Sequence, residues 1–239
     1  FAERIDLQLH NDRYSHYNKI LGSIRDIEKK LVALSFRINT REWEPLVKEL
    51  RVFPKLTKLK IFVEGKINLY SESFKLLERC EQITHLKLKT YFQSTDLHTS
   101  FVKNVTFPKG LKKLSFSSEG YGFTCLQDHV PLFIKLSSLT HLKKLRWKWH
   151  IYWQDYLVNL ASYMPKSLTH LQLKCNFKGD IFDKENNEFY NKLSELPYLD
   201  SISLNFNCLH DENQVMKIGL LKNVQIFKLH LNNCYFDYL

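Results

Sequence analysis

The sequence predicts an α/β solenoid of about nine units, with a concave parallel β-sheet and helices on the convex side. Two observations support this prediction. A nine-residue frame of apolar positions recurs along the whole chain, and segments with apolar residues at helical spacing separate its copies. Internal repeats with a period of roughly 20–50 residues are typical of solenoids, in which each unit buries its apolar face only against its neighbours.

The frame is clearest at residues 168–176, LTHLQLKCN, where apolar residues occupy places 1, 4, 6 and 8 and asparagine occupies place 9. Copies whose place 1 is residue 31, 199 or 224 keep the asparagine, and copies at 56, 83, 111 and 142 keep apolar places without it. A partial copy begins at Ala2. Places 4, 6 and 8 alternate with places 3, 5 and 7, which is the period of a half-buried strand.

The segments between the frames follow helical spacing instead. Apolar residues three or four positions apart predict helices within 43–53, 70–77 and 153–164, and the acidic run at 211–214 predicts a helix start. Residues 92–107 have no clean helical pattern, so we expect a loop there. Four prolines stand two or three residues before a frame, where proline ends a helix and turns the chain. They are Pro54, Pro108, Pro165 and Pro197.

The period of the frame resembles that of a known superfamily. Place 1 recurs at residues 2, 31, 56, 83, 111, 142, 168, 199 and 224, so the spacing ranges from 25 (31 to 56) to 31 (111 to 142). The pattern resembles the leucine-rich repeat, with units of about 20–29 residues and an L-x-x-L-x-L-x-x-N/C motif. The longer, irregular units are similar to the ribonuclease-inhibitor and F-box-associated branches. The resemblance covers residues 1–239 as a single domain and implies a fold rather than a function.

The predicted concave face is strongly basic. The five central units are those whose place 1 is residue 56, 83, 111, 142 or 168. Their places 3, 5 and 7 give fifteen side chains, of which nine are Lys or Arg, two are His and none is acidic. The rate in the whole chain, 35 Lys and Arg in 239 residues, would give about two in fifteen. These eleven basic residues are the candidate partner-binding set: Lys58, Lys60, His85, Lys87, Lys89, Lys113, Lys144, Arg146, Lys148, His170 and Lys174.

A net charge of +10 favours an acidic partner. The sequence therefore predicts a non-catalytic protein–protein interaction scaffold that binds an acidic protein surface on this face, as part of a larger complex. One alternative is that the lysines only keep the sheet soluble. RNA binding, as a ribonucleoprotein-associated subunit, is another, although no RRM or KH signature occurs and Phe62 is the main aromatic available for base stacking. The resemblance leaves a third, the substrate-recognition repeats of an F-box-type ubiquitin ligase receptor, although no F-box-like segment precedes the repeats.

Other classes of function find little support. The chain has no G-x-S-x-G, P-loop, G-x-G-x-x-G or H-E-x-x-H motif, so we expect neither an enzyme nor a cofactor. Five dispersed cysteines without a C-x-x-C pair argue against zinc and disulfides, and favour a reducing intracellular compartment, cytoplasmic or nuclear. No apolar run approaches the roughly 20 residues of a membrane span. The first and last frames lack polar caps, so we expect a fragment of a longer chain or an assembly subunit.

Overall fold

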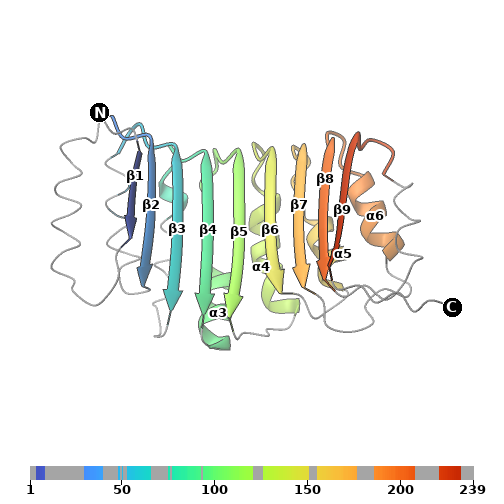
Figure 1. Cartoon of the computed structure of the whole chain (residues 1–239), viewed down its shortest axis with the longest axis horizontal. Helices are drawn as coiled ribbons and strands as arrows, with labels where there is room; N and C mark the ends of the chain where they lie inside the picture. The colour runs from blue at the N-terminus through green and yellow to red at the C-terminus, as the bar shows by residue number, and fades with distance from the viewer. Residues whose placement is uncertain are drawn as a thin grey trace.

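The computed structural model describes residues 4–8, 30–39, 48, 50, 53–65, 75, 77–92, 94–120, 126–150, 155–176, 186–207 and 221–232. Within these ranges the chain forms one parallel sheet, with helices packed against one of its faces (Figure 1). The strands follow one another across the sheet in chain order, so no connection crosses another. This is the architecture of a leucine-rich-repeat solenoid, and it confirms the predicted fold class.

Nine strands make up the sheet in the described ranges, and each begins at place 3 of a repeat frame. They are β1 (Arg4–Gln8), β2 (Ala33–Asn39), β3 (Lys58–Gly65), β4 (His85–Phe92), β5 (Lys113–Gly120), β6 (Lys144–His150), β7 (His170–Asn176), β8 (Ser201–Asn207) and β9 (Ile226–Asn232).

The register between strands has no stagger. Place 3 of each unit pairs with place 3 of the next, as Lys58 with His85 and Lys113 with Lys144. Side chains that share a place in the frame therefore form straight rows across the sheet. The rows alternate between the two faces because successive residues of a strand point to opposite sides.

A repeated backbone contact fixes this register at the start of each strand. The carbonyl oxygen at place 2 of one unit accepts the amide protons at places 2 and 3 of the next unit. Thr57 O accepts from Thr84 N and His85 N, both at 2.9 Å, and Lys112 O accepts from Lys143 N at 2.9 Å and Lys144 N at 3.1 Å. Because each unit is tied to the next at the same place, the rows stay aligned along the sheet.

The core lies between the sheet and the helices. Places 1, 4 and 6 of the central units are at most 2% exposed, and they are filled by leucine, isoleucine, phenylalanine or tryptophan. Trp147 and Trp149, which fall on inward places of the frame, are 0% and 5% exposed, as the pattern predicts. The Trp147 ring packs against Phe116 in a tilted arrangement, with ring centroids 4.6 Å apart. Apolar burial against neighbouring units thus accounts for the stability of the array.

The helices of the described part are α3 (Thr95–Asn104), α4 (Leu126–Ser137), α5 (Asp155–Ser162) and α6 (Asn186–Ser194). Neighbouring helices contact one another behind the sheet. Helix α5 confirms the helical pattern read between 153 and 164. None of these helices is both long and apolar enough to cross a bilayer.

Helix α3 corrects the expectation of a loop at 92–107. Ser94 caps this helix by accepting a hydrogen bond from the Leu97 amide at 3.3 Å. Its buried face includes Leu97, His98 and Phe101. A histidine on the buried face, among threonine and serine residues of low helix propensity, hides the apolar pattern from sequence analysis.

Some sequence predictions cannot be compared with the structure. The helices predicted at 43–53 and 70–77 fall mostly outside the described residues, and the helix start at 211–214 falls entirely outside them.

Candidate functional site: the basic concave face

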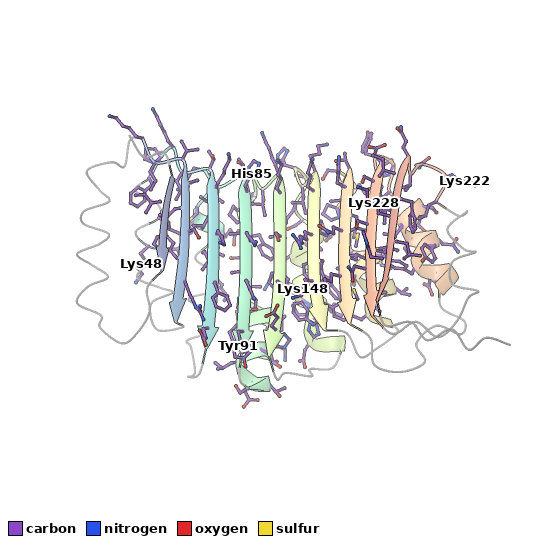
Figure 2. All side chains as sticks on the ribbon, viewed as in Figure 1. Lys48, His85, Tyr91, Lys148, Lys222 and Lys228 are labelled. Carbon is purple, nitrogen blue, oxygen red and sulfur yellow. The ribbon has the colours of Figure 1, made fainter. Side chains whose placement is uncertain are left out.

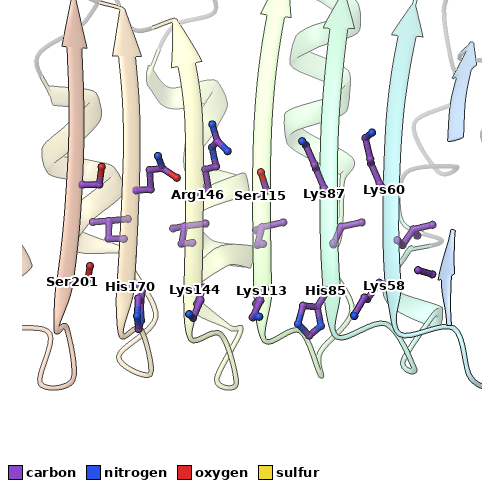
Figure 3. A pocket seen from close by; sticks show the side chains of 18 of the residues that line it. Lys58, Lys60, His85, Lys87, Lys113, Ser115, Lys144, Arg146, His170 and Ser201 are labelled. Atoms are coloured by element: carbon purple, nitrogen blue, oxygen red, sulfur yellow. The ribbon is translucent and has the colours of Figure 1, made fainter. Parts of the chain in front are cut away.

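The face of the sheet opposite the helices carries a shallow hollow of about 960 Å³ that extends from β2 to β9. Eight of the eleven predicted basic residues line it, and they lie side by side on five neighbouring strands (Figure 3). The eight are Lys58, Lys60, His85, Lys87, Lys113, Lys144, Arg146 and His170. Lys228 and His230 of β9 also line the hollow, so basic side chains reach further along the sheet than the central units.

The basic residues form rows because the strands are in register. The place-3 row consists of Lys58, His85, Lys113, Lys144 and His170. Neighbouring parallel strands are about 4.8 Å apart, so the first atoms of these side chains repeat at that interval. Three of these five residues are lysines, and Lys113 and Lys144 are direct neighbours in the register, although like charges on neighbouring strands are disfavoured.

The place-5 row shows how strongly these charges act on one another. Burial lowers the pKa of Lys87 from its ordinary value. The positive charges of Lys60, Arg146 and Lys89 lower this pKa further. No ion pair to Lys60, Lys87 or Arg146 is found within the described ranges. An anion placed among these residues would therefore relieve repulsion as well as gain attraction.

The two histidines of the place-3 row share a contact with the preceding threonine. Thr84 Oγ1 lies 2.9 Å from His85 Nδ1, and Thr169 Oγ1 lies 2.8 Å from His170 Nδ1. Each threonine hydroxyl also lies within hydrogen-bond distance of the carbonyl of the preceding unit, 3.3 Å for Thr84 and 2.9 Å for Thr169. The imidazole tautomer decides whether Nδ1 or the hydroxyl donates in the Thr–His contact. Burial lowers the pKa of His85, and the charges of Lys113 and Lys58 add to this effect.

Two of the predicted residues are already paired. Glu119, at the end of β5, accepts a hydrogen bond from Lys148 at 2.6 Å and lies 3.0 Å from the Lys89 ammonium. Burial raises the pKa of Glu119, but the hydrogen bonds from both lysines outweigh burial and hold it below its ordinary value. One carboxylate cancels one of the two ammonium charges, so Lys89, Lys148 and Glu119 together keep a single net positive charge. Lys174 is half-buried on β7 and does not line the hollow.

The exposed end of β3 is neutralised in a similar way. Arg37 of β2 lies 3.2 Å from the Glu64 carboxylate. The Arg37 guanidinium also lies 4.8 Å from the centre of the Phe62 ring, and the Lys89 ammonium lies 5.2 Å from it. In the part of the chain that the structure describes, positive charge without an acidic partner is thus concentrated where the strands begin, whereas Glu64 and Glu119 pair with basic side chains toward the strand ends. Figure 2 shows His85 near the beginning of its strand and Lys148 toward the end of its own.

Sequence reasoning missed Glu119 and Glu64, because both stand at place 9, beyond the three places taken to face the hollow. The alignment of the rows is the signal that could have found them. It sets Glu119 between the β4 and β6 lysines and within reach of both. Within the described residues, no group of three or more His, Cys, Asp or Glu side chains is arranged to hold a metal ion.

Comparisons with known proteins add one finding. No family model matches the sequence, and no curated protein matches it. Among solved structures, a crystal structure of a TLR13–ssRNA13 complex is similar to this chain, with 19% identity and a TM-score of 0.47. The match covers 97% of this chain and 33% of that one, so the chain spans about a third of its length. The description of the fold rests on the sheet and its repeat, not on this likeness.

Proposed function

We propose that this protein is a non-catalytic interaction scaffold whose concave face binds an acidic protein surface. The observation that supports this proposal is the set of uncompensated cations in one hollow, above all Lys60, Lys87 and Arg146. Stable proteins rarely keep like charges this close without a reason, because each pair opposes folding. An acidic partner would supply the missing countercharge, and charge complementarity would give it a fast and selective association.

The aromatic residues of the face favour a protein partner over single-stranded RNA. Binding of RNA without sequence preference relies on exposed rings on which bases stack. Phe62 is the aromatic residue at the outward places of the central strands, and the cations of Arg37 and Lys89 already lie over its ring. A base that stacks on Phe62 would compete with these cations for the ring.

Fluorescence anisotropy with two labelled probes of equal charge, an oligoglutamate peptide and an oligouridylate, tests this proposal. We expect the chain to bind oligoglutamate more tightly, and to lose at least about tenfold in affinity as salt rises from roughly 50 to 500 mM. Preference for oligouridylate at matched salt would instead assign the face to RNA. Failure to bind oligoglutamate even at low salt would leave the basic face as a solubilising surface.

A further inference from the structure

The Glu119 bridge shows how the sheet holds a carboxylate. The carboxylate receives one lysine from each side of β5, Lys89 from β4 through Oε2 and Lys148 from β6 through Oε1. Its side chain is 25% exposed. Between the two lysines β5 carries the short side chain of Ser117. The register sets Lys89, Ser117 and Lys148 side by side on the three strands.

The same arrangement occurs one row closer to the start of the strands, without a carboxylate. Lys87 of β4 and Arg146 of β6 stand on either side of Ser115 of β5. Two strand spacings separate them, about 10 Å between their first atoms, which long side chains can bridge around one anion. Figure 3 shows Lys87 and Arg146 extending on either side of the short Ser115 side chain.

Serine at this place differs from its nearest neighbours in the row. Place 5 carries a long polar or charged side chain on the strands around β5, with Lys60 on β3, Lys87 on β4, Arg146 on β6 and Gln172 on β7. A long side chain at Ser115 would fill the space between its neighbours. The serine leaves a notch with a hydroxyl at its base, an ammonium on one side and a guanidinium on the other.

We propose that this notch of Lys87, Ser115 and Arg146 binds a carboxylate side chain of the acidic partner, in the way that the next row binds Glu119. This inference rests on the proposed function and names its anchor point. The guanidinium of Arg146 can donate two parallel hydrogen bonds to a carboxylate, Lys87 supplies a point charge, and the Ser115 hydroxyl can donate a third contact. The partner would present an aspartate or glutamate that enters between β4 and β6.

The first test adds a carboxylate to the notch by substitution of Ser115. Ser115→Asp places a carboxylate between Lys87 and Arg146, within their own row, whereas Glu119 reaches its lysines from two residues further along β5. Ser203→Asp is the matched control, because Ser203 has the same place on β8 and lines the same hollow. Both variants change the net charge equally. We expect Ser115→Asp to weaken oligoglutamate binding by about tenfold and Ser203→Asp by less than about twofold.

A second pair of variants tests the notch without adding a carboxylate. Lys87→Gln with Arg146→Gln removes its two cations, and Lys58→Gln with Lys144→Gln removes two from the place-3 row. We expect the Lys87→Gln/Arg146→Gln variant to weaken binding about tenfold more than the Lys58→Gln/Lys144→Gln variant.

The possible outcomes separate this proposal from the general one. Suppose that the unchanged protein binds oligoglutamate, but that Ser115→Asp weakens binding no more than Ser203→Asp, and the Lys87/Arg146 double variant no more than the Lys58/Lys144 one. The notch is then not the anchor point, and the acidic-partner function stands. If the unchanged protein does not bind oligoglutamate, the proposed function itself fails. If oligouridylate binds more tightly and loses more affinity in Ser115→Asp than in Ser203→Asp, the notch takes phosphate and the carboxylate assignment is overturned.

Discussion

Replacing Lys87, Lys144 and Arg146 together by glutamate is expected to weaken oligoglutamate binding by at least about a hundredfold. Each change turns an attraction into a repulsion of similar size. If each is worth about 1 kcal/mol, the sum is about 3 kcal/mol, or two factors of ten. All three side chains are exposed, so their reversal disturbs no buried contact. It also removes like-charge repulsion, so the free energy of unfolding should not fall.

The control reverses three lysines outside the hollow, Lys109, Lys166 and Lys192. They change the net charge by the same amount but lie in the turns before β5 and β7 and on α6. We expect this control to retain binding within about threefold, because these side chains do not line the hollow and salt screens exposed charges that do not contact the ligand. Anisotropy titrations of both triple variants, with urea unfolding of each, make the comparison. Equal losses in the two would mean that overall charge governs binding.

A fall in stability below pH 6.5 is the second large effect that we expect. His98 of α3 is 4% exposed and packs against the rings of His129 of α4, 5.4 Å away, and Trp149 of β6, 5.1 Å away. Burial lowers the pKa of His98 to about 3, with a further lowering by His129, while Asp128 raises it. The unfolded chain therefore binds a proton at His98 below pH 6.5, whereas the folded chain binds this proton only near pH 3. The free energy of unfolding should drop by up to about 1.4 kcal/mol per pH unit in that window.

His98→Phe removes this titration and keeps a ring in the cluster, so its stability should depend less on pH between 6.5 and 3. His141→Phe is the matched control, because His141 lies in an exposed turn before β6. Urea unfolding midpoints measured across this window give the comparison. A slope in His98→Phe as steep as in the unchanged protein would show that His98 takes up no extra proton on unfolding.

The sheet could be predicted from the sequence because each strand is set by its own nine residues. Every frame gives the first residue of a strand and the direction of each side chain, and the parallel register then follows from stacking equal units. The frame and this register are also enough to predict that Lys60, Lys87 and Arg146 lie close together. Helix α3 could not be predicted, because the histidine on its apolar face becomes compatible with burial only when α4 and β6 surround it.

The division of the basic face into paired and unpaired halves also lay beyond sequence reasoning. Whether Glu119 pairs with Lys89 and Lys148 depends on how three side chains from three units meet. The frame gives their rows but not their conformations. The notch at Ser115 could not be predicted for the same reason, because it depends on how the long side chains of β4 and β6 stand on either side of the serine.

Lysine acetylation, followed residue by residue with and without oligoglutamate, tests most directly whether the hollow is the binding surface. We expect bound peptide to slow acetylation of Lys58, Lys60, Lys87, Lys113 and Lys144, all of which line the hollow. Acetylation of Lys109, Lys166 and Lys192 should not change. Equal slowing in the two groups, or slowing confined to the second, would contradict the claim that the concave face binds the acidic partner.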